Sequence, residues 1–145
     1  QIDIGIPVLI PSDYVPELGV RLTLYRRIAD LVDRPEIESF AAELIDRFGT
    51  LPEEVENLLE TVAIKRLCLA AGIEKVDAGS KGAVISFRNN TFVNPVGLVE
   101  FISAQVGITK LRPDHKLVFL RSWDDVESRL DGVQYLINAL SKIAA

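Results

Sequence analysis

The chain has 145 residues and a formal net charge of −5 at pH 7. Hydrophobic residues make up 48% and charged residues 26%, a balance typical of soluble globular proteins that excludes intrinsic disorder. No window approaches the ~20 consecutive apolar residues of a membrane-spanning helix, and the acidic balance argues against nonspecific nucleic-acid binding, which needs clustered Lys and Arg.

The chain contains no Met and begins with Gln1. We therefore expect it to be a segment of a longer protein, so that part of its function lies outside this sequence. The single Cys68 excludes an internal disulfide and fits the reducing environment of the cytoplasm. The length predicts one domain over residues 1–145.

The N-terminal residues alternate, with apolar side chains at every second position from Ile2 to Ile10. Period two predicts an extended segment with one buried face. Pro7 favours an edge strand or a tether over a central strand. After a turn-rich loop, apolar spacing predicts a short helix over about residues 20–32.

Capping residues mark the next helix. Asp33 and Glu36 form a capping-box-like pair, and apolar residues recur at helical spacing until Gly49, which suits the left-handed conformation that ends a helix. A long helix is predicted over about 53–71, where Gly72 stops it.

The character of the chain then changes. Segments 73–77 and 83–88 are predicted strands, joined by a hairpin turn over 78–82. The remaining predicted elements are a helix over about 94–105, a strand over 117–120 and a final helix capped by Ser122 and Asp125. The order is an N-terminal extended segment, three helices and a β-β-α-β-α unit. This predicts an α+β fold with helices packed on a small, mostly antiparallel sheet.

The net negative charge is concentrated in residues 30–60, which carry ten acidic and two basic side chains. A rotation of about 100° per residue places Glu43, Asp46 and Arg47 together on the helix face opposite the apolar stripe. Glu43 and Asp46 lie one turn apart, which suits recognition of Arg or Lys on a protein partner. The alternative is an acidic surface that faces only solvent.

The sequence offers little for catalysis. His115 is the only His and lies in a polar turn, where we expect it at the surface, and Cys68 lies within an apolar helix, where we expect it in the core. Asp124 and Asp125 suit helix capping better than metal binding. Neither of the glycine-rich nucleotide-binding motifs, GxGxxG and GxxxxGK[ST], is present. We expect no catalytic, cofactor or metal site; the alternative is a small enzyme that uses His115 or Cys68.

One loop, Gly79-Ser80-Lys81-Gly82, has the GxxG form of a KH-domain loop, which clamps a nucleic-acid backbone. In a KH domain this loop joins two helices, whereas predicted strands flank it here, so a hairpin turn is favoured. Lys75, Lys81 and Arg88 form a weak basic edge. They keep open the alternative of a nucleic-acid-binding accessory domain.

Several segments together carry a resemblance to a known family. They are Leu9-Ile10-Pro11-Ser12-Asp13-Tyr14-Val15-Pro16, Arg21-Leu22 with Leu24-Tyr25-Arg26-Arg27-Ile28-Ala29, and Glu43-Leu44-Ile45-Asp46-Arg47-Phe48-Gly49 with Leu51-Pro52. In order and spacing they resemble the C-terminal domain of bacterial transcription-repair coupling factors, the Mfd family. The resemblance covers nearly the whole chain.

The resemblance implies a regulatory domain of a large ATP-dependent DNA translocase that removes stalled RNA polymerase and recruits nucleotide excision repair. It implies docking on a UvrB-like N-terminal module of the same protein, masking of the UvrA-binding surface and restraint of the ATPase motor. Residues 1–11 would then lead in from the motor domain. Glu43, Asp46 and Arg47 would contact basic residues on the docked module, and the domain itself would not be catalytic.

Overall fold

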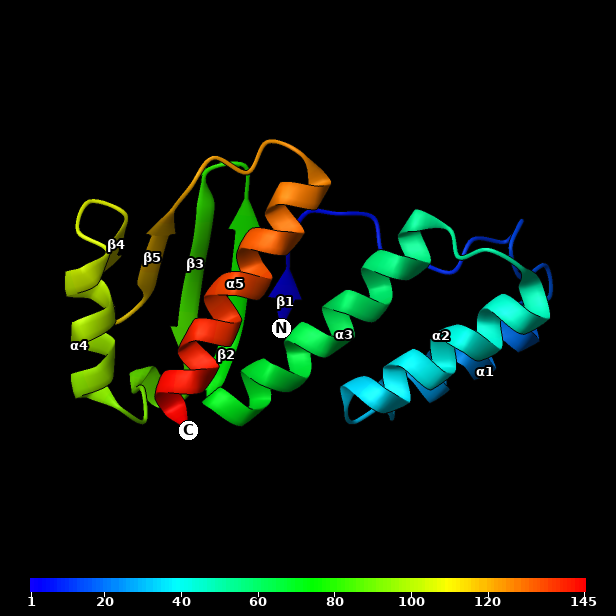
Figure 1. The fold of residues 1–145 in the computed structure, drawn as a ribbon, viewed down its shortest axis with the longest axis horizontal. Helices are drawn as coiled ribbons and strands as arrows, with labels where there is room; N and C mark the ends of the chain where they lie inside the picture. Colours follow the sequence, from blue (N-terminus) through cyan, green and yellow to red (C-terminus); the bar gives the residue numbers. More distant parts are fainter. The chain divides into compact units, whose positions relative to one another are not determined.

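The computed structural model describes all of residues 1–145. Figure 1 labels its helices and strands and colours them by their position along the chain. The chain forms two compact units. Unit 1 comprises Gln1–Ile6 and Leu67–Ala145, and unit 2 comprises Pro7–Arg66. None of the helices combines the length and the hydrophobicity that crossing a lipid bilayer requires.

Unit 2 is helical. It contains α1 (Leu18–Ala29), α2 (Arg34–Phe48) and most of α3 (Glu53–Ala71). Buried apolar side chains from all three helices and from the loop before α1 form one core. Its members include Val15, Leu24, Ile28, Phe40, Leu44 and Val55. The three predicted helices are therefore confirmed.

The ends of α2 follow the capping pattern in the sequence. The side chain of Asp33 accepts a hydrogen bond from the Glu36 backbone N–H at 2.9 Å, as predicted for an N-cap. At the other end, Gly49 has a φ of +94°, a conformation in which a side chain is strained. Both ends of the helix that carries the acidic face are thus set by local sequence.

Unit 1 is built on a five-stranded sheet. The strands are β1 (Ile2–Asp3), β2 (Ile73–Gly79), β3 (Gly82–Phe87), β4 (Thr109–Leu111) and β5 (Leu117–Leu120), in the spatial order β1-β2-β3-β5-β4. Only the β1–β2 pair is parallel. The predicted α+β class with a mostly antiparallel sheet is confirmed.

The long helix α5 (Val126–Ala144) lies across β2 and β3 in Figure 1. Its buried residues recur at helical spacing: Val133, Leu136, Ile137 and Leu140. Alternate residues of the strands are buried as well, because successive side chains of a strand point to opposite faces of the sheet. This helix-on-sheet layer forms the core of unit 1.

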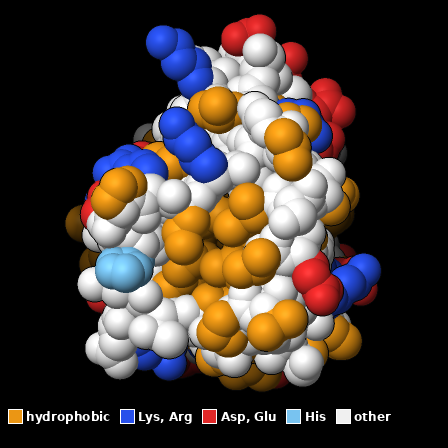
Figure 2. All heavy atoms as spheres, turned by 90° about the vertical axis from the view of Figure 1, so that its left-hand side faces the viewer, with side chains coloured by type: hydrophobic (Ala, Val, Ile, Leu, Met, Phe, Trp, Pro, Cys, Tyr) orange, Lys and Arg blue, Asp and Glu red, His pale blue; other side chains and the backbone are white.

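The helix α4 (Pro95–Ala104) follows a short 3₁₀ turn (Arg88–Asn90) and precedes the edge strand β4. Only Leu98 of α4 is fully buried. Val96 and Val99 are 69% and 61% exposed. Figure 2 shows the side of the molecule on which α4 lies, and hydrophobic side chains gather in the middle of this face.

Two local predictions differ from the structure, and a third holds in part. The strand β4 was not predicted, because only Thr109 of its three residues is buried and no alternation is visible. The predicted N-terminal extended segment forms an edge strand, β1, over Ile2–Asp3 alone, and Gly5 then adopts a φ of +67°. Asp125, and not Ser122, is the N-cap of the last helix.

Candidate functional site

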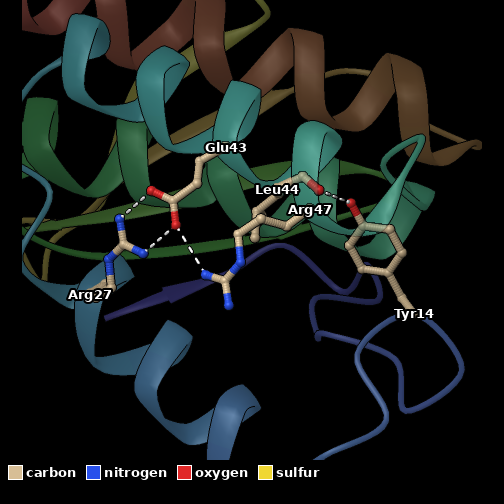
Figure 3. Close-up of polar contacts among 5 residues, drawn as sticks. All are labelled: Tyr14, Arg27, Glu43, Leu44 and Arg47. Atoms are coloured by element: carbon tan, nitrogen blue, oxygen red, sulfur yellow. Dashed lines mark hydrogen bonds and ion pairs between the residues drawn. The ribbon is translucent and has the colours of Figure 1, made fainter.

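An ion-pair cluster joins α1 to α2. The guanidinium of Arg27 donates to both carboxylate oxygens of Glu43, from Nη1 to Oε2 at 2.6 Å and from Nη2 to Oε1 at 2.7 Å. Arg47, one turn after Glu43 on α2, donates from Nη1 to the same Oε2 at 3.1 Å. Figure 3 shows the carboxylate between the two guanidinium groups. Glu43 is therefore shared by two arginines of its own chain.

The electrostatics of this cluster favour the ionised carboxylate. The hydrogen bond from Arg27 is the largest cause that lowers the pKa of Glu43, to about 2, and the bond from Arg47 acts in the same direction. The same hydrogen bond raises the pKa of Arg27. The side chains of Arg27 and Glu43 are 43% and 36% exposed, so water screens much of their attraction.

Aromatic rings of α2 position both guanidinium groups. The Cζ of Arg27 lies 4.9 Å from the ring centroid of Phe40, and the Cζ of Arg47 lies 4.9 Å from that of Phe48. A guanidinium over an aromatic face gains cation–π attraction. The two arginines are thus held by stacking as well as by charge.

Tyr14, in the loop before α1, closes the C-terminal end of α2. Its hydroxyl lies 3.1 Å from the carbonyl oxygen of Leu44 (Figure 3). It also lies 2.8 Å from the carbonyl oxygen of Gly49, so one proton serves two acceptors. Its ring contacts Phe48, with centroids 5.7 Å apart. The carbonyl of Gly49 lies beyond the last residue of α2 and has no partner within the helix, and this tyrosine supplies a donor to it.

Asp46 lies on the outward face of α2, beside the cluster. It is exposed and forms no ion pair and no side-chain hydrogen bond. Its neighbours on this face, Ser39 and Ala42, are small and exposed, and Ile45 is 50% exposed. Of the three predicted contact residues, the structure joins Glu43 to Arg47 and leaves Asp46 available.

A shallow hollow adjoins the cluster on the side of the α2 N-terminus. Its volume is about 350 Å³ and it opens widely to solvent. Arg27, Phe40 and Glu43 line it together with residues at the start of α2. The cluster therefore borders an uneven surface, which offers more contact area to a partner than a flat helix face.

The three residues of the nucleic-acid alternative do not form one cluster. Lys81 lies at the tip of the β2–β3 hairpin, and Arg88 follows β3 at the opposite end, where its N–H donates to the Gly72 carbonyl. At about 3.3 Å per strand residue these ends are roughly 20 Å apart. Lys75 lies between them on β2.

The glycine loop itself is a tight hairpin turn. Gly82 has a φ of +124°, and a Cβ there would lie 1.9 Å from the carbonyl oxygen of Phe119 on β5. Strands flank the loop on both sides. The predicted hairpin is confirmed, although its turn is shorter than expected because β2 continues to Gly79 and β3 begins at Gly82.

The two residues considered for catalysis lie apart from any cluster. His115 is exposed in the β4–β5 turn, and Cys68 is buried, as expected from their places in the sequence. Burial raises the pKa of the Cys68 thiol to about 12. No group of three or more His, Cys, Asp or Glu side chains is arranged to hold a metal ion.

Two contacts of the candidate site were not expected from the sequence. Arg27 precedes Glu43 by sixteen positions and lies on another helix, so no spacing rule links them. Tyr14 belongs to a loop, and loop residues have no helical or strand periodicity from which the direction of a side chain could be predicted. The only signal was indirect, since both residues lie within the segments that carry the family resemblance.

Comparisons with known proteins agree with one another. A family model described as TRCF domain matches residues 4–98. The transcription-repair-coupling factor of Rickettsia bellii is 44% identical over 120 residues, which cover 83% of this chain and 11% of that protein. The corresponding factor of Escherichia coli is 31% identical over 99% of this chain and 12% of that protein. This chain thus spans about a tenth of the length of the curated relatives it matches.

A solved structure has the same fold. The crystal structure of the C-terminal domain of a transcription-repair coupling factor superposes with a TM-score of 0.81 at 23% sequence identity. The match covers 99% of this chain and 92% of that one.

Proposed function

Because this chain belongs to the TRCF domain family and has the fold of the C-terminal domain of a transcription-repair coupling factor, we propose that it is an autoregulatory protein-interaction domain. In this proposal it docks on the UvrB-like N-terminal module of its parent translocase in the bacterial cytoplasm. Docking masks the UvrA-binding surface and restrains the ATPase motor until RNA polymerase is engaged.

The observation that carries the proposal is the available carboxylate of Asp46 beside an ordered cluster. Asp46 has no partner in the chain, so a basic residue of the docked module binds it without breaking an internal bond. Glu43 accepts from Arg27 and Arg47, so a partner shares Glu43 by competing with Arg47, whose bond is the longer one. Arg47 displaced in this way becomes a donor to the partner.

The expected affinity of this surface is modest. An exposed ion pair contributes only ~0.2–1 kcal/mol, so charge alone does not hold two modules together. Ile45, half exposed beside Asp46, supplies apolar area. An interface built from a few weak ion pairs and a small apolar area dissociates readily, which suits a domain that restrains a motor reversibly.

The direct test is a titration of this chain with the isolated N-terminal module. We expect Asp46→Lys to raise the Kd about fivefold to tenfold, because an attraction becomes a repulsion. Glu74→Lys is the matched control, since it makes the same charge change at an exposed position on β2 in unit 1. Equal effects of the two substitutions would show only a general field effect and would remove Asp46 from the interface.

A second measurement uses the full-length parent protein. Asp46→Lys is expected to raise ATP turnover in the absence of RNA polymerase and to increase UvrA binding, while Glu74→Lys leaves both unchanged. If this chain instead binds DNA, and Lys81→Glu with Arg88→Glu abolishes that binding, the nucleic-acid alternative replaces this proposal.

A further inference from the structure

A row of valines on α4 and its C-terminal flank has no partner. Val96 and Val99 on α4 and Val106 in the following turn are 69%, 61% and 81% exposed. We call these three residues the valine stripe. They lie in unit 1, whereas the face proposed to dock on the N-terminal module lies in unit 2.

Neither packing nor helix propensity explains the stripe. Leu98 anchors α4 from the opposite side of the helix and is 6% exposed, so the stripe is not needed for the core. Valine is also a weak helix former, because its branched Cβ restricts χ1 against the preceding turn. A surface helix built for stability alone would carry Ala, Lys or Glu at these positions. Val96 and Val99 lie three positions apart, on one face of α4. Exposed apolar side chains that gather in one patch mark interaction surfaces.

The chain around the stripe is basic, although the whole protein is acidic. Residues 88–121 carry five Lys or Arg and two Asp or Glu, and one of these acids, Asp114, is paired with Arg112. Lys110 and Arg121 form no ion pair. In Figure 2 the hydrophobic side chains occupy the middle of this face, with Lys and Arg side chains above them and toward the upper left.

We propose that the valine stripe and the basic residues beside it bind an amphipathic helix of a partner protein, with an apolar face and acidic flanks. The apolar face covers the valines, as one helix packs on another, and the acidic flanks pair with Lys110 and Arg121. Pairing with Lys110 and Arg121 therefore favours an acidic partner over a basic one.

The same features favour a peptide over an anionic membrane. Helices that lie in a membrane interface carry Lys or Arg on their own polar face and Trp, Phe or Leu on the other. The only charged residue of α4 is Glu100, and its exposed apolar residues are valines. Such a helix is poorly suited to insert between lipid headgroups.

The test titrates this chain into fluorescently labelled synthetic helices of about 18 residues, long enough to remain helical when bound. One helix has a leucine face flanked by Glu, and its twin has the same face flanked by Lys. We expect the Glu-flanked helix to bind about tenfold more tightly, by fluorescence anisotropy, with an affinity that falls as salt rises.

Surface variants locate the site. Val96→Ser with Val99→Ser, and separately Lys110→Glu with Arg121→Glu, are each expected to weaken binding of the Glu-flanked helix about tenfold. Val32→Ser is the matched control, because Val32 is 57% exposed but lies in unit 2 and is expected to leave binding unchanged. Circular dichroism verifies that each variant is folded.

Four outcomes would overturn the proposal. The Lys-flanked helix could bind equally well, the valine substitutions could leave the affinity unchanged, or anionic vesicles could compete through the same valines. A dimer in sedimentation velocity at pH 7, where the chain keeps its net charge of −5, that disappears with Val96→Ser and Val99→Ser would identify a second copy of this chain as the occupant. None of these outcomes depends on Asp46, so this proposal and the proposed function fail separately.

Discussion

At the residue scale, Arg27 explains why Glu43 has an ordered position on an exposed surface. A single exposed ion pair orders little, but here a bidentate pair, a second guanidinium and stacking on Phe40 act together. Any other rotamer of Glu43 would break at least one of these contacts. A partner that binds this face of α2 would therefore contact a preorganised surface, which reduces the entropy lost on binding.

This cluster has a defined dependence on pH. Because folding lowers the pKa of Glu43 from its ordinary value of 4.5 to about 2, the stabilisation is complete above about pH 4.5 and is lost as the pH falls through about 2. We expect Glu43→Gln to lower the free energy of unfolding by about 0.5–1 kcal/mol at pH 7, since the pairs are about 40% exposed. The difference from wild type should shrink toward zero at pH 2. Urea unfolding at several pH values measures it.

Asp46→Asn is the control for this prediction. Asp46 is exposed and forms no ion pair or side-chain hydrogen bond, so its replacement should change the free energy of unfolding by less than about 0.5 kcal/mol. If Asp46→Asn destabilises the protein as much as Glu43→Gln does, general charge and not the cluster accounts for the effect.

At the element scale, α5 carries a glycine at a position where any side chain meets a neighbour. A Cβ on Gly132 would lie 2.3 Å from Nε1 and Cε2 of the Trp123 ring, which is buried. Replacing a helical glycine with alanine ordinarily stabilises a helix by about 1 kcal/mol. Here we expect Gly132→Ala to destabilise the protein by about 1–3 kcal/mol, because the ring must move within a packed core.

Two variants isolate the cause. In a Trp123→Leu background the ring is absent, so Gly132→Ala should become neutral or stabilising, as a double-mutant cycle measures. Gly19→Ala in α1 is the matched control, since nothing lies within 4 Å of the added Cβ, and it should not destabilise. Destabilisation that persists without the indole ring would refute this explanation.

Helices and strands could be predicted from the sequence where the residues that specify them lie within the element or next to it. The caps at Asp33 and Asp125, the positive φ at Gly49 and the periodic stripe of α5 all act within a few residues, and the structure shows each of them. The strand β4 was missed because an edge strand with one buried residue has no pattern of its own. Its existence depends on pairing with β5, which lies beyond a turn.

The site was predictable only in part for the same reason. Helical rotation placed Glu43, Asp46 and Arg47 on one exposed arc, and α2 has them there. The periodicity of one helix cannot predict that Arg27, on another helix, pairs with the carboxylate of Glu43, because that pair depends on how the helices of unit 2 pack. Whether this face binds a partner module stays a prediction.

At the scale of the whole molecule, net charge opposes the tendency of exposed valines to associate. The chain carries −5 at pH 7 and has a calculated isoelectric point near 4.9. We expect self-association to rise as the pH approaches 4.9, because repulsion between copies vanishes there. Light scattering between pH 7 and pH 4.5 measures this. Val96→Ser with Val99→Ser should reduce it, and unchanged scattering by that variant would place the association elsewhere.

The burial of Cys68 also bears on how this protein can be studied. Its thiol is the only one in the chain, and burial raises the pKa of that thiol to about 12, so very little of it is thiolate at pH 7. Maleimide reagents attack the thiolate, so the native chain is nearly silent to them. A cysteine introduced at Asp46 or Val99 would therefore take a spectroscopic label selectively, and each surface could be followed while a partner is added, without first removing the natural thiol.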